Sequence, residues 1–194
     1  MANQLKSTFP NMFIVLTVIC LISAAALGFT YSQTTDRIES LKAQERAEAI
    51  RQVLPEFDNN PAEEEFSPEE YPRLTMYPAT ENDNRVGTAV RSYSEQGYSG
   101  TIWIMVGFNA DGVITGTAVL EHQETPGLGA KMTGEAFRNQ FDGFDPAEQE
   151  LEVTKDGGDV DAITAATVTS RAFCDAVKRA YEALQEEGAE DGST

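Results

Sequence analysis

The chain has 194 residues, a length that suits one domain with appendages and allows a hydrophobic core without disulfides or metals. It carries 14 lysines and arginines against 32 aspartates and glutamates, which gives a formal net charge of -18. So acidic a surface repels phosphate backbones, and we therefore exclude nucleic acid as a partner. The two cysteines, Cys20 and Cys174, have no spacing typical of a disulfide framework or a metal site.

The N-terminal region contains a long apolar run. From Met12 to Tyr31 the chain reads "MFIVLTVICLISAAALGFTY", without a charged residue. A helix needs about 20 apolar residues to cross the hydrocarbon core of a membrane, so we predict a transmembrane helix over residues 12–31. The segment "SAAALG" also resembles a signal-peptide cleavage site, but the run exceeds the usual signal core of about 7–15 residues.

The orientation of this helix is predicted from its flanks. Residues 1–11 form a short leading segment, which favours a cytoplasmic tail and a domain exported across the membrane. Arg37 and Lys42 follow the span and count against this orientation. We expect a single-pass protein of the cell inner membrane with its domain on the periplasmic or extracytoplasmic side.

Residues 32–85 are predicted to hold a juxtamembrane helix and an acidic linker. Apolar residues recur at helical intervals among charges until Pro55, at Ile38, Leu41, Ala49, Ile50 and Val53. The following "DNNPAEEEFSPEEYPRLTMYPATENDN" mixes carboxylates with prolines, and neither periodicity nor propensity assigns it to a regular element.

A folded domain is predicted over residues 86–186, with an acidic tail at residues 187–194. The strand-like runs "RVGTAVRSY", "GTIWIMVGF" and "VITGTAVLEH" are joined by turn-forming segments, which predicts an antiparallel meander. The middle run is apolar on both faces, as expected for a strand covered on two sides. "GEAFRNQF" is typical of a short helix and "ELEVTK" of another strand. The predicted fold class is therefore α+β, a largely antiparallel sheet flanked by helices.

The last predicted helix begins in the stretch "DAITAATVTSRAF", residues 161–173. Its apolar stripe consists of Val168, Ala172, Phe173, Ala176, Val177, Ala180, Tyr181 and Leu184. A helix start exposes unpaired N–H groups and a partial positive charge, which hydroxyls can cap or which can hold a phosphate. Four hydroxyl residues lie here, Thr164, Thr167, Thr169 and Ser170. The local pattern leaves two interpretations open, a simple cap by Thr164 and an anion site.

A second unusual stretch, "EHQETPGLGAKM" at residues 121–132, leaves the meander as a loop. Pro126 restricts its backbone, while Gly127 and Gly129 permit conformations and close approaches that other residues resist. The loop is either an ordinary turn or a surface that lies flat against a ligand. His122, the only histidine, either packs at the strand end or contributes to such a site.

Together, "HQETPGLGAK" and "KDGGDVDAITAATVTSRA" resemble the G subunit of the Rnf ion-translocating electron transport complex. This family is related to the C subunit of the sodium-pumping NADH:quinone reductase, and both carry an FMN-binding domain. The resemblance implies a membrane-anchored flavoprotein that relays electrons, with the other membrane subunits of the complex as partners and no catalytic residues of its own. The C-type subunit and an anchored, non-redox binding module of the same fold are the alternatives.

In that family, a segment of Asp, two variable residues, Ser or Thr, Gly, Ala and Thr receives FMN through a phosphoester to its last threonine. Asp161, Thr164, Ala166 and Thr167 match this pattern, and Ala165 replaces the usual glycine. The resemblance implies that a separate flavin transferase attaches FMN to Thr167. The further cofactor-binding residues that it implies are Glu124, Thr125, Gly127, Leu128, Gly129, Thr164, Ala166, Thr169 and Ser170.

Overall fold

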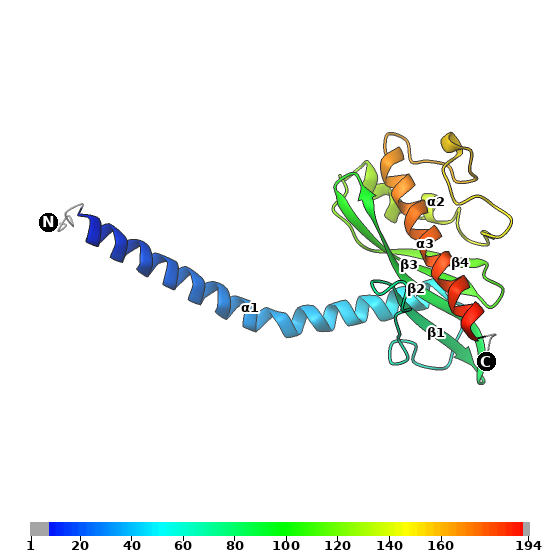
Figure 1. Ribbon diagram of the computed structural model, residues 1–194, viewed down its shortest axis with the longest axis horizontal. Coiled ribbons are helices and arrows are strands. Elements are labelled where there is room, and N and C mark those ends of the chain that lie inside the picture. The colour runs from blue at the N-terminus through cyan, green and yellow to red at the C-terminus, as the bar shows by residue number, and fades with distance from the viewer. Residues whose placement is uncertain (1–7, 192–194) are drawn as a thin grey trace. The chain divides into compact units, whose positions relative to one another are not determined.

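The computed structural model describes residues 8–191, and the chain divides into two compact units, one ending at Gln44 and the other starting at Glu45. A single helix, α1 (Phe9–Val53), contains the whole apolar run and continues into the second unit (Figure 1). The predicted membrane and juxtamembrane helices are thus one uninterrupted element, which ends two residues before Pro55. Most of the predicted tail at residues 1–11 lies outside the described residues.

The second unit is built on a four-stranded antiparallel sheet with the strand order β1-β2-β3-β4. The strands are β1 (Thr75–Glu81), β2 (Asn84–Gly97), β3 (Gly100–Asn109) and β4 (Ile114–Glu121). Short helical segments follow: η1 (Gly129–Thr133), α2 (Glu135–Arg138) and η2 (Thr154–Asp156). The long helix α3 (Thr167–Asp191) ends the described chain. The predicted meander and the α+β fold class are confirmed.

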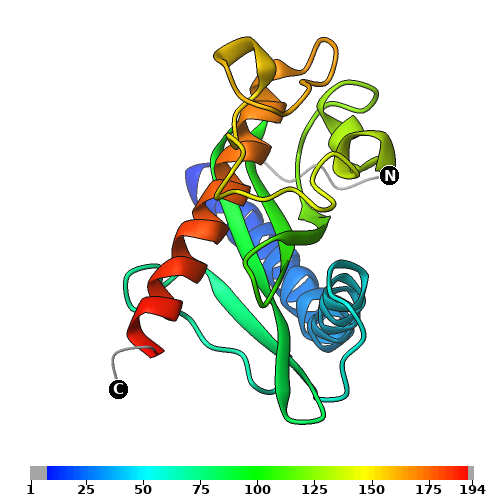
Figure 2. The same cartoon turned by 90° about the vertical axis from the view of Figure 1, so that its right-hand side faces the viewer.

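The sheet is covered on both faces, as we predicted from the apolar residues on both sides of the middle strand. Ile102, Ile104, Val106 and Phe108 of β3 belong to the core cluster that includes most of the apolar stripe of α3. Val168, which we predicted to belong to that stripe, is instead exposed. Met105 points to the opposite face and packs with the last turns of α1. Figure 2 shows α3 and the end of α1 against the strands. The alternation of β3 therefore places one helix on each side of the strand.

Strand β1 lies in the segment that we predicted to be an irregular linker. Its sequence "TMYPATE" contains Pro78, which reads as a strand breaker because proline has no N–H to donate. β1 is an edge strand of the sheet. It pairs with β2 on one side and forms an isolated bridge, between Met76 and Phe66, on the other, and an edge tolerates a proline that a central strand does not. The linker prediction was therefore wrong for residues 75–81.

The strand predicted from "ELEVTK" is also absent from the sheet, since residues 150–155 form only an isolated bridge between Val153 and Val160. The side chains of Leu151 and Val153 are buried in the core, which explains their alternation. Their backbone neighbours bond instead to the turn that follows, with the Thr154 N–H donating to the Val160 carbonyl at 2.8 Å. The alternation of apolar and polar residues in this segment therefore reflects burial of Leu151 and Val153 in the core, not pairing in a sheet.

Candidate functional site

The threonine-rich stretch contains a tight turn that leads into α3. The N–H of Ala166 donates to the carbonyl of Ile163 at 2.9 Å, and α3 begins at the next residue, Thr167. Ala165 occupies the third position of this turn with φ 64°. A positive φ at that position favours glycine, because the Cβ of other residues crowds the backbone.

The four hydroxyls of this stretch have different environments. Thr169 is buried and donates to the Glu124 carboxylate at 2.7 Å. Ser170 is buried, accepts from the Ile163 N–H at 2.9 Å and donates to the Ala166 carbonyl at 3.1 Å. Both hydroxyls therefore hold the fold together. Thr164 is exposed, and Thr167 is half-buried with its hydroxyl accepting from the Lys155 ammonium at 3.2 Å.

Glu124 joins the glycine-containing loop to α3. Besides the Thr169 hydroxyl, its carboxylate accepts the backbone N–H of Ser99 at 2.9 Å, at the tip of the β2–β3 hairpin. The backbone N–H of Glu124 donates to Nδ1 of His122 at 3.1 Å, so the histidine shapes the loop. The two stretches that we singled out therefore meet in the fold, at a buried carboxylate.

Gly129 sits against this contact. A Cβ at this position would collide with Oε2 of Glu124 and would lie 2.6 Å from Oγ1 of Thr169. Only glycine leaves the contact intact, because real side chains do not approach so closely. Gly127 has φ 76° and open space around it, so it serves the turn. The side chains of Thr125 and Leu128 are exposed, outside the contact.

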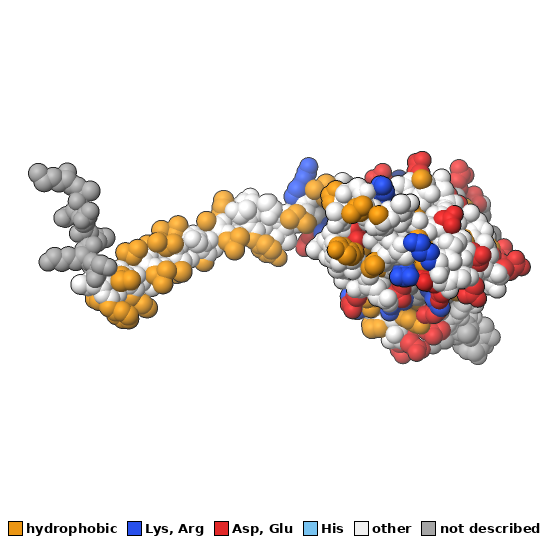
Figure 3. Space-filling view, turned by 90° about the horizontal axis from the view of Figure 1, so that it is seen from above, with side chains coloured by type: hydrophobic (Ala, Val, Ile, Leu, Met, Phe, Trp, Pro, Cys, Tyr) orange, Lys and Arg blue, Asp and Glu red, His pale blue; other side chains and the backbone are white. Residues whose placement is uncertain are grey.

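Exposed apolar side chains flank the same contact. Tyr98, Leu128 and Val168 are 74%, 43% and 44% exposed, and they are the chain neighbours of Ser99, Gly129 and Thr169, respectively. Figure 3 shows exposed hydrophobic side chains among charged ones on the second unit. Large exposed apolar side chains next to buried contact residues are candidates for ligand or protein contacts. The sequence patterns of the loop and the hairpin did not predict a role for Tyr98.

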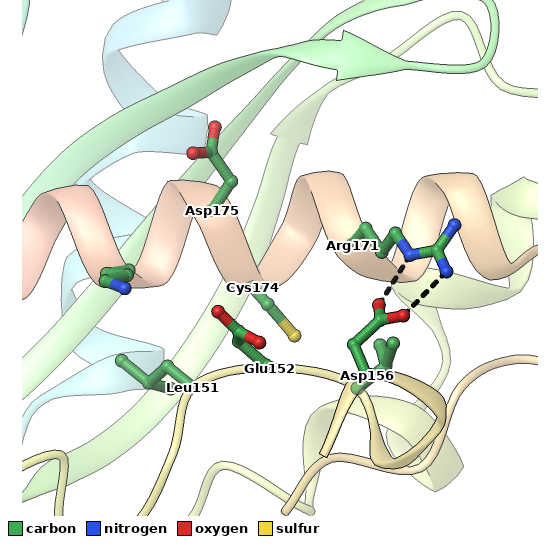
Figure 4. A pocket seen from close by; sticks show the side chains of 8 residues that line it. Leu151, Glu152, Asp156, Arg171, Cys174 and Asp175 are labelled. Carbon is green, nitrogen blue, oxygen red and sulfur yellow. Dashed lines mark hydrogen bonds and ion pairs between the residues drawn. The ribbon is translucent and has the colours of Figure 1, made fainter. Parts of the chain in front are cut away.

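A charged pocket of about 290 Å³ lies between α3 and the segment 151–156 (Figure 4). Asp156 and Arg171 form a bidentate ion pair in it, with distances of 2.6 and 2.8 Å, and the hydrogen bond from Arg171 lowers the pKa of Asp156. Cys174 also lines the pocket, and burial raises the pKa of its thiol to about 12. The thiol therefore stays protonated at neutral pH and is a poor nucleophile.

Replacing Ala165 with glycine is expected to stabilise the domain. A left-handed backbone costs an L-residue about 1–2 kcal/mol, and glycine avoids most of that cost, so we expect a gain of about 1 kcal/mol. For a chain of this size the unfolding midpoint should rise by about 2–4 °C, followed by the fluorescence of Trp103. The control Ala166→Gly, at a buried position without a positive φ, should lower the midpoint. A lower unfolding midpoint for Ala165→Gly would contradict the inference that the positive φ of Ala165 destabilises the domain.

The chain is similar to known proteins in three comparisons. Residues 97–182 match the family model of the FMN-binding domain. The chain is 34% identical to the G subunit of the ion-translocating oxidoreductase complex of Methanosarcina acetivorans, over 89% of this chain and 92% of that protein. It is 36% identical to the G subunit of the Na(+)-translocating ferredoxin:NAD(+) oxidoreductase complex of Acetobacterium woodii, over 89% of each.

Among solved structures, NqrC of Shewanella oneidensis is similar, with 25% identity, a TM-score of 0.45 and 61% of each chain covered. The sequence identity to the two G subunits extends over 92% and 89% of their lengths, and residues 97–182 match the FMN-binding domain. The chain therefore belongs to the family of G subunits of ion-translocating oxidoreductase complexes, which carry an FMN-binding domain.

Proposed function

We propose that this chain is a membrane-anchored flavoprotein subunit that relays electrons in an ion-translocating oxidoreductase, through FMN attached covalently to Thr167. The observation that carries the proposal is that the hydroxyl groups of the threonine-rich stretch have different hydrogen-bond partners and different exposure. Thr169 and Ser170 are committed to buried hydrogen bonds, whereas Thr167 is half-buried at the start of α3 beside an ammonium group. That setting suits a hydroxyl that receives a phosphate group.

The residues around Thr167 fit FMN in their chemistry. The first turn of α3 offers backbone N–H groups to a phosphate, and Lys155 offers a cation. Leu128 and Val168 offer exposed apolar surface to a flavin ring, and the Glu124–Thr169 contact fixes the loop that carries Leu128. Bound FMN would supply the electron-transfer chemistry, and the protein would orient it.

Attachment requires FAD and a separate flavin transferase. An ester bond forms between Oγ1 of Thr167 and the FMN phosphorus, the phosphoanhydride of FAD breaks, AMP leaves, and the hydroxyl loses its proton. Thr167 is thus a tether with no part in the redox chemistry. We propose residues 86–186 as the FMN-binding domain, and the other membrane subunits of an Rnf-type complex as its electron-transfer partners.

A membrane anchor is supported by α1, the helix among residues 8–191 that is long and apolar enough to cross a membrane. Figure 3 shows hydrophobic side chains around its N-terminal half, and none of its most apolar stretch is buried. We propose a single pass through the cell inner membrane with the domain outside the cytoplasm. A helix near the N-terminus also suits a signal sequence, so retention needs its own test.

Protease added to spheroplasts is expected to digest the domain, because the proposed orientation exposes residues 32–194 outside the membrane. N-terminal sequencing of the mature chain should find residue 1 or 2. Digestion only after the membrane is lysed would contradict the orientation, and a mature N-terminus near residue 27 would contradict the anchor.

Flavin fluorescence tests the proposed function as a whole. The chain is produced with an active flavin transferase, denatured and separated on a gel, which removes any flavin held without a covalent bond. A fluorescent band supports the flavoprotein, because only an attached flavin survives denaturation. A dark band, with a fluorescent band from a known acceptor protein in the same cells, would instead support a non-redox binding module.

A further inference from the structure

Lys155 contacts Thr167 from outside the threonine motif. We infer that Lys155 is the phosphate-binding cation of the flavin site, contacting Thr167 before attachment and a phosphate oxygen afterwards, and that the Asp156–Arg171 ion pair holds it in place. The inference rests on the proposed attachment of FMN to Thr167. It adds a binding residue and two positioning residues that lie outside the threonine motif.

The contact with Thr167 is direct. Lys155 lies at the centre of η2, and its ammonium donates to Oγ1 of Thr167 at 3.2 Å. The backbone of η2 is fixed from both ends, by the Thr154 N–H on the Val160 carbonyl and the Asp156 N–H on the Val153 carbonyl, each at 2.8 Å. Lys155 therefore extends from an anchored segment.

The next residue of η2 is tied to the same helix. Thr167 and Arg171 are four residues apart on α3, so their side chains share one face of the helix. Lys155 contacts the first of them, and Asp156 holds the second through two hydrogen bonds (Figure 4). Lys155 and Asp156, which are consecutive in η2, thus both bond to side chains on the first turns of α3. These contacts keep the Lys155 ammonium next to the Thr167 hydroxyl.

The charges of this region favour an added anion at Lys155. The carboxylate of Asp156 is already paired with Arg171, and the ion pairs found within residues 8–191 do not include Lys155. A phosphodiester on Thr167 adds one negative charge to a chain whose formal net charge is -18. An ammonium is a compact charge that binds phosphate oxygens from several directions, and it would offset that repulsion locally.

The test compares charge variants of the full-length chain in two measurements. The first is the initial rate of flavin attachment with purified flavin transferase and limiting FAD. Lys155→Ala should react about tenfold more slowly, the order expected for losing one charge-assisted hydrogen bond, and Lys155→Arg should recover most of the rate. The second is the ³¹P chemical shift of the attached phosphodiester in phosphate-free detergent, which Lys155→Ala should change.

Lys178→Ala is the matched control, because it also removes one exposed lysine charge, at a position on α3 about 16 Å along the helix from Thr167. It should behave like the wild type in both measurements. Asp156→Asn should slow attachment less than Lys155→Ala, because it weakens the Asp156–Arg171 ion pair but keeps the Lys155 ammonium. All variants should unfold at nearly the wild-type temperature, because Lys155, Asp156 and Lys178 are all exposed.

The remaining outcomes separate the claims. A wild-type rate and ³¹P shift in Lys155→Ala would overturn the inference, as would an equal loss of rate in Lys178→Ala. A slower rate with an unchanged ³¹P shift would mean that the transferase recognises Lys155 during attachment. That result would also overturn the inference that Lys155 binds the attached phosphate. Failure of the wild type to become labelled on Thr167 would contradict the proposed function itself.

Discussion

Replacing Thr167 with alanine is expected to abolish covalent flavin attachment while leaving the fold nearly intact. The substitution removes the oxygen that forms the ester. The hydroxyl is half-buried and bonds to Lys155, an exposed side chain, so its loss costs at most about 0.5–2 kcal/mol as a helix-start residue. In-gel fluorescence of the denatured chain measures attachment, and the thermal unfolding midpoint measures the fold.

Two companion variants sharpen this result. Thr164→Ala removes an exposed hydroxyl three residues away and should keep full attachment. Thr167→Ser keeps an attacking oxygen but loses the methyl group that restricts its rotamers, so part of the attachment should survive. Persistence of the full adduct in Thr167→Ala would show that another residue carries the flavin.

Gly107→Ala is expected to destabilise the domain more than any other substitution that we consider. A Cβ at Gly107 would collide with the carbonyl oxygen of Val53 and would lie 2.8 Å from Oγ1 of Thr115. The same two residues form a hydrogen bond, from the Thr115 hydroxyl to the Val53 carbonyl at 2.5 Å, that ties the end of α1 to the sheet. The clash is with backbone, so either α1 or β3 must shift.

We expect this variant to lose about 3 kcal/mol, the upper range for overpacking a core. The unfolding midpoint should fall by about 6–12 °C, measured by the fluorescence of Trp103, the chain's one tryptophan, which lies in β3. Gly188→Ala is the control, because its Cβ would meet nothing within 4 Å on α3. A midpoint for Gly107→Ala equal to that of the control would contradict the clamping of α1 on the sheet.

Local patterns predicted the parts of the fold that local physics determines. The strands of the meander and helix α3 carry regular apolar spacing between turn-forming residues, and both were predicted near their observed bounds. β1 was missed because Pro78 masks an edge strand, and residues 150–155 were misassigned because burial against a core mimics the alternation of a strand. These errors concern tertiary context, which no short window contains.

The candidate site was predicted unevenly for the same reason. The contact between Glu124 and Thr169 joins residues 45 positions apart, so spacing alone did not reveal it, and only the family resemblance paired the two stretches. The positive φ of Ala165 gives a physical reason for the glycine usual at that position in the family. Lys155 was not predicted, because a lysine in an irregular segment leaves no periodic signal.

The mass of one tryptic peptide tests the central claim most directly. Cleavage after Lys155 and Arg171 releases residues 156–171, which contain all four candidate hydroxyls. When the chain is produced with an active flavin transferase, the peptide should be heavier by FMN less one water, and fragmentation should place the added mass on Thr167. An unmodified peptide, or an adduct on Thr164, Thr169 or Ser170, would contradict the account.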